Sequence, residues 1–400
     1  MSLISVAKKP AFWGLCLSIL IPSIGVCQKY LGLKGVIPYL LVGTIGLMIV
    51  LAYEDSWFAW LKESNVGIAA ILIAAALLAV FLIVYPMANS GRFGGGSDTD
   101  EAITLAATNL LYGKYPYYAR TYLGNPIDPL PGAILLSVPF VLLRNVGYQN
   151  LFWMMLGFVG LRSYLKSSKQ ALILSCLILA FSPRLMSLYL VGNDDIANTL
   201  YVLLSMTLLL TLASRKDSKE RNKILVAVLL GICFSSRANF LFVLPVLFSS
   251  LIRQVGWTRA FGYMAISGLA FLAVTLPFFL YDPVGFTPFH TMHKLTRFNQ
   301  VLPHADIIIA LVTLGTGVAL SVKWNDGSIS ALLRNCSIVL AIPILFSLVI
   351  PSLKVIHLRN AGYGIFCLFF AAPYFWHKLK KEDTDREKDV TSGTSIAASP

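Results

Sequence analysis

The sequence predicts an all-α, polytopic integral membrane protein. Hydrophobic residues make up 57% of its 400 residues, charged residues only 13%, and the mean hydropathy is +0.73. Soluble domains contain about 45–50% apolar and about 25% charged residues, so this chain cannot cover its own surface with polar groups. Lipid must cover much of it. The composition therefore excludes a soluble enzyme, a nucleic-acid-binding domain, a disulfide scaffold and a disordered regulator.

Long apolar runs predict about 11–13 transmembrane helices, since a helix needs about 20 residues to cross a bilayer. We expect a single transmembrane domain over residues 1–377 and a disordered cytoplasmic tail over 378–400, because the tail is polar and has few bulky side chains. The predicted spans are roughly 11–27, 35–53, 66–88, 132–147, 148–165, 171–191, 195–213, 224–252, 260–281, 304–322, 331–351 and 359–377.

Charged loops predict which helix ends face the cytoplasm. Cytoplasmic loops of membrane proteins carry an excess of Lys and Arg. Lys8, Lys9, the loop 215–223 and the basic start of the tail are therefore expected in the cytoplasm. The more acidic segment 89–131 is expected on the outer face of a multi-pass protein, in a bacterial cell membrane.

Two of the apolar runs are interrupted. Ser182-Pro183-Arg184 breaks the run 171–191, because proline cannot continue a helix without losing a backbone bond. Three runs lie between the outer loop and Asp194, and this odd number would place Asp194 in the cytoplasm. A broken or re-entrant pair at 182–184 would restore the outer position. The run 224–252 is too long for one plain span, and its polar residues 235–239 predict two short helices joined by an outer turn.

The outer loop 89–131 carries three carboxylates, on Asp98, Asp100 and Glu101. Apolar residues follow them at the spacing of an amphipathic helix that ends at Gly113. Carboxylates at a helix start interact favourably with the helix dipole, so capping is one interpretation. A functional site is the other, because acidic residues at the mouth of a membrane cavity are often functional.

A motif follows this predicted helix. It reads Tyr112-Gly113-Lys114-Tyr115-Pro116-Tyr117 and then enters the next span through Asp128-Pro129-Leu130-Pro131-Gly132. Together with the preceding aspartate, it resembles the GT-C superfamily of membrane glycosyltransferases. It is most similar to the polyprenol-phosphate-mannose-dependent mannosyltransferases of glycosyltransferase family 87. Here Thr104 stands where that family has an aromatic residue, and two further spans precede the loop.

This resemblance implies an enzyme that transfers a hexose such as mannose, with inversion, from a polyprenyl-phosphate donor to a lipid-linked or glycan acceptor on the non-cytoplasmic face. Asp100 would be the catalytic base or the carboxylate that orients the acceptor, since a desolvated carboxylate can accept the proton of an attacking hydroxyl. Glu101 and Asp98 would tune it by like-charge repulsion. Tyr117 is a candidate contact of the acceptor.

The leaving lipid phosphate requires cations near the outer membrane boundary. Arg184 and Arg237 interrupt apolar runs, where an arginine costs about 2.5–3.5 kcal/mol on insertion scales, and Arg359 opens the final span next to Lys354. All four are candidate phosphate ligands, because the guanidinium fork of arginine grips phosphate with two parallel bonds and the lysine ammonium attracts it as a point charge. A structural ion pair or snorkelling remains open for Arg237, and a cluster facing lipid headgroups remains open for Arg359.

Asp194 and Asp195 open the span 195–213. They are predicted either to cap this helix or to form a second acidic element that faces Asp100 or pairs with Arg184. A divalent metal such as Mg or Mn could bind there, because hard cations prefer carboxylate oxygens. The metal is left open, as the superfamily divides on metal dependence.

One competing class stays open at the sequence level. A multi-span transporter or lipid flippase would also place charges in membrane helices, although such proteins show related halves and no convincing internal repeat is visible. Glycine fingerprints of soluble-nucleotide sites are absent. The expected partners are the polyprenyl-phosphate sugar, the acceptor and membrane lipids, with no nucleic acid.

Overall fold

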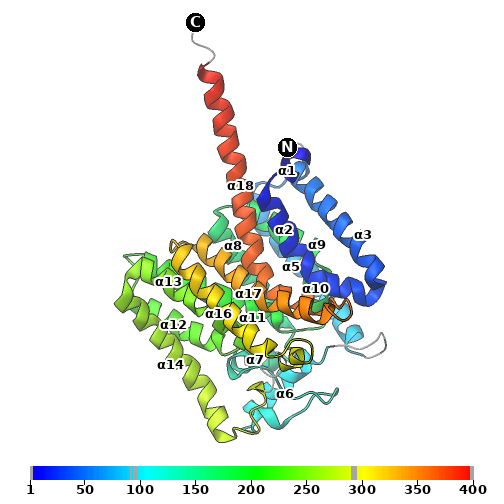
Figure 1. The fold of residues 1–400 in the computed structure, drawn as a ribbon, viewed down its shortest axis with the longest axis vertical. Coiled ribbons are helices and arrows are strands. Elements are labelled where there is room, and N and C mark those ends of the chain that lie inside the picture. Colours follow the sequence, from blue (N-terminus) through cyan, green and yellow to red (C-terminus); the bar gives the residue numbers. More distant parts are fainter. Residues whose placement is uncertain (1–2, 91, 93–96, 290–294, 397–400) are drawn as a thin grey trace.

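The computed structural model describes residues 3–90, 92, 97–289 and 295–396. Over these ranges the chain is helical and contains no β-sheet, only one isolated bridge between Arg120 and Pro126 (Figure 1). The α-helices are α1 Leu3–Ala7, α2 Pro10–Leu20, α3 Ile24–Ala52, α4 Glu54–Trp57, α5 Val66–Ala88, α6 Thr99–Leu111, α7 Pro131–Leu142, α8 Tyr148–Leu165, α9 Ser168–Phe181, α10 Pro183–Leu190, α11 Asp195–Ser214, α12 Glu220–Phe234, α13 Leu244–Val255, α14 Trp257–Tyr281, α16 Ala305–Lys323, α17 Ile329–Ser352 and α18 Ile365–Ile396. Short 3-10 helices are η1 Ile21–Ser23, η2 Glu63–Asn65, η3 Pro116–Tyr118, η4 Ala238–Val243, η5 Thr296–Gln300 and η6 Arg359–Gly364.

Seven of the described helical stretches are long and apolar enough to cross a membrane, or eight if the bent pair α9 and α10 counts as one span. They confirm the prediction of an all-α, multi-pass membrane protein. The predicted 11–13 crossings stay a prediction, because the stretch Pro10–Ala52 alone contains two helices, α2 and α3. Helix α7, with 12 residues, is about 18 Å long at a rise of 1.5 Å per residue, against a hydrocarbon core of about 30 Å.

The predicted interruptions occur where the sequence places them. Helices α9 and α10 meet at Ser182-Pro183 with a bend of 84°. The Ser182 side chain accepts a hydrogen bond from the Leu185 backbone and so caps α10. The run 224–252 likewise divides into α12 and α13, separated by a non-helical turn that contains Arg237 and by η4.

Contacts between chain segments sort the helix ends into two groups. At one end, Lys380 pairs with Glu54, and Ser167 donates to Glu63. At the other end, Tyr85 donates to Asp100, and Arg237 pairs with Asp194. We call the first group the basic end, because the Lys/Arg-rich loop 215–223 and the start of the tail belong to it, and we call the second the acidic end. In Figure 1 the basic end lies at the top, with α18 beside the N-terminus, and α6 and α7 lie at the bottom.

Helix α7 begins and ends at the acidic end. Its Gly132 amide donates to Ser235 Oγ, beside Arg237, and Gly147 after the helix lies within 3.5 Å of where a side chain on Gly192 would stand. Between these points α7 packs along α6. The run 132–147 is therefore not a crossing, which corrects the prediction. This segment, and not a re-entrant break at 182–184, places Asp194 at the same end as the segment 97–131.

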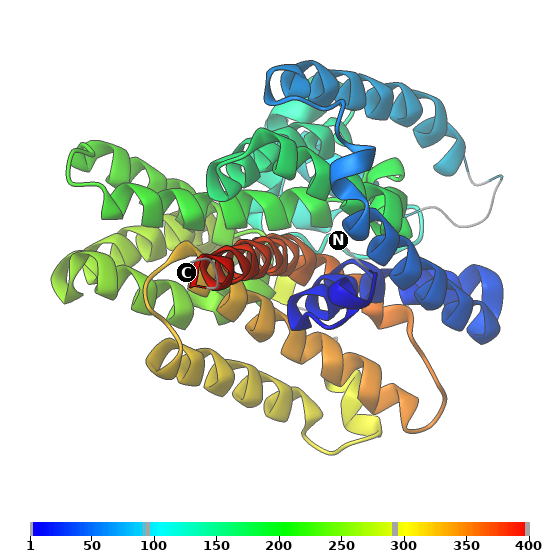
Figure 2. The ribbon, with the colours of Figure 1, turned by 90° about the horizontal axis from the view of Figure 1, so that it is seen from above.

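Helix α11 is the most buried of the seven spans, with 67% of its apolar window inside the protein. It packs against α8, α12, α13 and α18. Helix α18 in turn packs against α2 and α17, and in the view from above it lies near the middle of the bundle (Figure 2). The central position of α11 carries Asp194 and Asp195, at its start, into the protein interior.

The segment from Lys378 to Ile396 continues α18 as a helix, whereas the sequence predicts a disordered tail there. The difference has a local cause in its first turn. Lys380 forms an ion pair with Glu54, and Asp383 pairs with Lys9, which is only 1% exposed. These pairs fix the start of the extension against α2 and α4, and helix formation propagates from a nucleus more easily than it starts.

Candidate functional site

Arg237 lies within a buried ionic cluster at the acidic end. Its Nη2 is 2.7 Å from Asp194 Oδ1 and 3.6 Å from Asp195 Oδ1, and its Nη1 is 3.5 Å from Asp128 Oδ2. Asp194 and Asp195 are 1% and 5% exposed. One guanidinium thus faces three carboxylates, which come from the α6–α7 connection and from the start of α11. The structural ion pair that the sequence leaves open for Arg237 is present.

A row of polar side chains continues this cluster into the bundle. Asn198 Nδ2 donates to Asp194 Oδ2 at 2.8 Å, and the Tyr201 hydroxyl donates to Asn198 Oδ1. These residues share one face of α11, since positions three and four apart are neighbours on a helix. All three are buried. Polar groups in a membrane helix are costly and usually functional, so we include this row in the site.

Asp100 lies in the first turn of α6, where the sequence predicts an amphipathic helix. Its Oδ2 accepts hydrogen bonds from the Tyr85 hydroxyl at 2.7 Å and from Asn89 Nδ2 at 3.0 Å. The residue is 7% exposed. Burial raises the pKa of the Asp100 carboxyl above its ordinary value, while the bond from Tyr85 partly opposes this shift. A carboxylate of this kind is oriented and is a stronger base than an exposed aspartate.

Gly192 joins Asp100 to the ionic cluster. It has a φ of 71°, a conformation that suits glycine. A methyl group there would lie 2.9 Å from Tyr85 Cε2 and 3.3 Å from Asp100 Cβ. Next in the chain, Asn193 donates through Nδ2 to Thr99 Oγ1 at 3.1 Å. The start of α6 and the turn before α11 are therefore packed directly together.

Arg184, at the start of α10, lies beside η6. A methyl group on Gly362 would stand 2.9 Å from its Nε, and its backbone amide donates to Ser23 Oγ at 3.0 Å. Its charge acts on Asp195, so it belongs to the same electrostatic environment as Arg237. Within the described chain, its buried Nε has no hydrogen-bond partner. This donor is available to a ligand.

The side chains of Asp98 and Glu101 brace the loop after α6. Asp98 Oδ2 accepts from Thr121 Oγ1 at 2.6 Å and from Asn125 Nδ2 at 2.8 Å, and Glu101 Oε2 accepts from the Tyr122 amide at 2.8 Å. Asp98 occupies the N-cap position of α6 but makes no side-chain capping bond. The expectation that these two carboxylates belong with Asp100 in the chemistry is therefore weakened by their engagement with the 121–125 loop.

Tyr117 lies in a small core under the outer segment. It is 2% exposed, its ring packs edge-on against Phe278 and Phe286, and its hydroxyl donates to the Pro129 carbonyl. In this structure its ring and hydroxyl are thus engaged within the protein, and its contact with the acceptor stays a prediction.

Lys354 and Arg359 lie further from the cluster, at the end of α17 and the start of η6. Both are exposed, and Lys354 Nζ lies 3.4 Å from the Gln300 carbonyl. The Arg359 backbone packs against Gly25, and Gly362 of the same short helix touches Arg184. Helix η6 therefore connects the predicted cationic residues Arg359 and Arg184, while Arg237 stands apart with its three acids.

A metal centre gains no support from the described residues. No group of three or more His, Cys, Asp or Glu side chains in the ranges given above converges as metal ligands would. Asp194 and Asp195 face Arg237 instead, and Asp100 faces Tyr85 and Asn89. A cation site shared by Asp100 and the α11 acids is thus not formed.

Unpaired buried polar atoms concentrate around this site. Of nine such side-chain atoms in the described part of the chain, seven belong to segments that border the acidic cluster. Most buried polar groups in proteins have partners, so each exception needs a cause such as a ligand or water. The seven atoms are Gln149 Nε2, Asn150 Oδ1, Trp153 Nε1, Arg184 Nε, Tyr189 Oη, Ser236 Oγ and Arg237 Nε.

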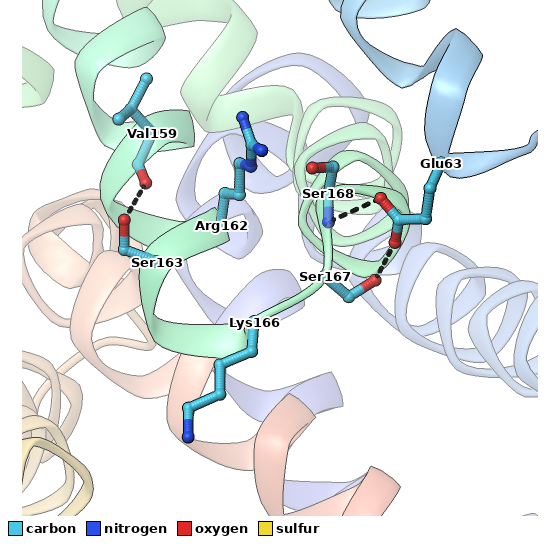
Figure 3. A pocket seen from close by; sticks show the side chains of 7 residues that line it. All are labelled: Glu63, Val159, Arg162, Ser163, Lys166, Ser167 and Ser168. Atoms are coloured by element: carbon cyan, nitrogen blue, oxygen red, sulfur yellow. Dashed lines mark hydrogen bonds between the residues drawn. The ribbon is translucent and has the colours of Figure 1, made fainter.

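A cavity of about 450 Å³ lies at the basic end, away from this cluster. Figure 3 shows Glu63 pointing to the first residues of α9, while Arg162 and Lys166 on α8 point away from it. Glu63 accepts bonds from Ser167 Oγ and from the Ser168 and Lys169 amides. The carboxylate thus satisfies the helix N-terminus itself. The predicted gathering of charges at the acidic end does not coincide with this cavity.

Sequence reasoning missed several residues of the site. Tyr85 and Asn89 lie at the end of an apolar span, and Gln149 and Asn150 lie at the start of another. Such polar residues at span ends are ordinarily interpreted as interfacial. The signal that could have found Asn198 is its position four residues after Asp194 inside an otherwise apolar helix.

The comparisons with known proteins found no relative of this chain. No family model, no curated protein and no solved structure matches it.

Proposed function

We propose that this chain is a membrane glycosyltransferase that moves a hexose from a polyprenyl-phosphate donor to a hydroxyl acceptor, with inversion. The observation that carries the proposal is the close packing of buried Asp100, through Gly192, against the cluster of Asp194, Asp195 and Arg237. A basic carboxylate and buried cations at one end of a bundle are what this reaction needs. The motif 112–117, which resembles GT-C mannosyltransferases, favours mannose as the hexose.

In the proposed reaction, Asp100 is the general base. Its carboxylate accepts the proton of the acceptor hydroxyl while that oxygen attacks the anomeric carbon from the face opposite the phosphate. The bond between the anomeric carbon and the phosphate oxygen breaks, and its electron pair leaves with the polyprenyl phosphate. Tyr85 and Asn89 hold Oδ2 of Asp100. Their bonds favour one orientation of the base.

The departing phosphate is assigned first to Arg184 and Arg359. Arg184 has an unpaired buried Nε beside η6, and Arg359 is exposed at the start of the same short helix. Arg237 is a weaker candidate, because a phosphate would have to compete with three carboxylates for its guanidinium. We therefore assign Arg237 to positioning Asp194 and Asp195, and Lys354 to the rim.

The reaction is proposed on the non-cytoplasmic side of the membrane. The loop 215–223 and the start of the tail place many Lys and Arg residues at the basic end, and such residues favour the cytoplasmic side. The acidic end, with Asp100 and Asp194, then faces outward. A polyprenyl-phosphate sugar that has reached the outer leaflet could enter from the lipid.

Sugar transfer in purified membranes tests this proposal. With a radiolabelled polyprenyl-phosphate mannose donor, we expect Asp100→Asn to lower transfer by about 10²–10⁴-fold, the usual contribution of a general base. Asp98→Asn is the matched control, because its carboxylate only contacts Thr121 and Asn125, and we expect a much smaller loss. Undiminished transfer by Asp100→Asn contradicts the assignment. Movement of label across vesicles without covalent transfer would favour the transporter or flippase instead.

A further inference from the structure

The first two turns of α8 present three side chains with buried polar atoms whose bonding is incomplete. Gln149 is 2% exposed and Asn150 is 0% exposed. In the described structure, Gln149 Nε2, Asn150 Oδ1 and the indole Nε1 of Trp153 have no hydrogen-bond partner. The set supplies two donors and one acceptor. Leaving a buried donor or acceptor unpaired costs about 1–3 kcal/mol, so three of them on one helix call for a ligand.

These three side chains leave α8 within an arc of about 100°. Successive residues of an α-helix are turned by about 100°, so positions 149, 153 and 150 fall at roughly 0°, 40° and 100° around the axis. The arc faces the start of α11. Asn150 Nδ2 donates to the Asn193 carbonyl at 2.8 Å, and the Trp153 ring packs edge-on against Tyr201 at 5.4 Å between centroids. Asn193 directly precedes Asp194, and Tyr201 belongs to the polar row that begins at Asp194.

The same arc lies next to the proposed base. Gly147, two residues before Gln149, is 3.5 Å from the position that a side chain on Gly192 would take, and that position is 3.3 Å from Asp100 Cβ. The start of α8 therefore contacts the turn 192–193, which lies beside Asp100 and directly precedes Asp194. A group bound here would be within reach of both acidic elements.

We propose that Gln149, Asn150 and Trp153 form the subsite that binds the hydroxyl groups of the transferred hexose. This inference rests on the proposed function and names the sugar contacts of that site. A hexose ring offers hydroxyls that both donate and accept, which matches two donors and one acceptor. Buried ligand sites typically combine apolar or aromatic walls with a few placed polar groups, and the rings of Trp153 and Tyr201 supply such a wall.

Monodeoxy donors test the subsite. Polyprenyl-phosphate hexoses that lack the 2-, 3-, 4- or 6-hydroxyl are compared with the parent donor by kcat/KM. For the wild type we expect at least one deoxy donor to lose about ten- to a hundredfold, because its protein partner stays unpaired. In Gln149→Met or Trp153→Phe the parent donor should lose a similar factor, and discrimination at that one hydroxyl should disappear. A merely structural role would lower all donors equally.

Two matched control variants distinguish a specific loss of donor discrimination from a general loss of stability. Trp376→Phe removes another unpaired buried indole donor, on α18 at the basic end, and Gln254→Met removes an amide that donates to the Gly327 carbonyl. Both should keep the wild-type discrimination. Trp153→Phe keeps an aromatic ring against Tyr201, so this variant still tests the subsite if Gln149→Met does not fold. Unchanged discrimination in the α8 variants overturns the subsite alone. No transfer by the wild type from any donor overturns the proposed function and the subsite together.

Discussion

The two ends of the bundle differ in how completely their buried polar groups are paired. At the basic end, buried Lys9 pairs with Asp383, and buried Glu54 pairs with Lys380. At the acidic end, three carboxylates share Arg237, and most of the unpaired buried atoms of the described chain collect around them. Stability alone would select the first arrangement, since unpaired groups are expensive. The acidic end therefore carries the stronger sign of function, although the cavity of about 450 Å³ lies elsewhere.

Removing the cation from each end is the strongest test of this contrast. Arg237→Met leaves Asp194 and Asp195 buried without their guanidinium, and breaking a buried pair costs about 3–5 kcal/mol. Lys223→Met removes the partner of Glu220, whose side chain is 57% exposed, and exposed pairs are worth less than about 1 kcal/mol. Denaturant unfolding of both variants in detergent, followed by circular dichroism, measures the difference. Equal losses would contradict the contrast.

Adding one methyl group at each end of the bundle tests the contrast between the two ends more finely. Gly192→Ala meets Tyr85 and Asp100 at 2.9 and 3.3 Å, whereas Gly256→Ala, with a similar φ of 79°, meets nothing within 4 Å. The backbone strain of about 1 kcal/mol is shared, so the excess in Gly192→Ala reports packing, and overpacking typically costs about 1–3 kcal/mol. We also expect transfer activity to fall in Gly192→Ala only. Thermal melting and a transfer assay on both variants measure these two effects. Equal melting temperatures would refute the close packing of Gly192 against Tyr85 and Asp100.

The helical extension of α18 predicts a smaller effect at the basic end. Truncation after Leu379 removes Lys380 and Asp383, which pair with Glu54 and Lys9. We expect a loss of about 1–2 kcal/mol, because two ion pairs disappear and one of them is formed by a buried lysine. Truncation after Asp383 keeps both pairs and should leave the unfolding free energy unchanged. Identical behaviour of the two truncations would support the disordered tail that the sequence predicts.

The smallest expected effect is a pH shift at the acidic end. Burial raises the pKa of Asp100, and the hydroxyl of Tyr85 lowers it. A general base works only when deprotonated, so kcat/KM falls as the pH drops through that pKa. Tyr85→Phe removes the lowering bond, and the acid limb should move to higher pH. Tyr118→Phe, which loses only an exposed bond to Asp282, should leave the limb in place. A shift to lower pH in Tyr85→Phe would refute the role of Tyr85.

Much of the architecture follows from sequence because hydropathy and helix breakers act locally. The bounds of α5 and α8, the end of α6 before Gly113 and the bend at Pro183 are all legible along the chain. The prediction of a membrane crossing at 132–147 was wrong for a different reason. Apolarity predicts burial, but it does not distinguish burial in lipid from burial against α6 and α12.

The candidate site was only partly predictable for the same reason. Asp100, Asp194 and Arg237 stand out as charges in or beside apolar runs. The distinction between Asp98 and Asp100, which differ by two residues, depends on whether Thr121 or Tyr85 lies opposite. Such contacts join segments far apart in sequence, and no local pattern encodes them.

Because α6 and α7 leave and rejoin the bundle at one end, the chain from 97 to 147 is an insertion between two spans that would otherwise be joined by a short loop. Its replacement alters no crossing before or after it. Sequence change within that insertion can therefore reshape the acidic end while the order and direction of the surrounding spans stay the same.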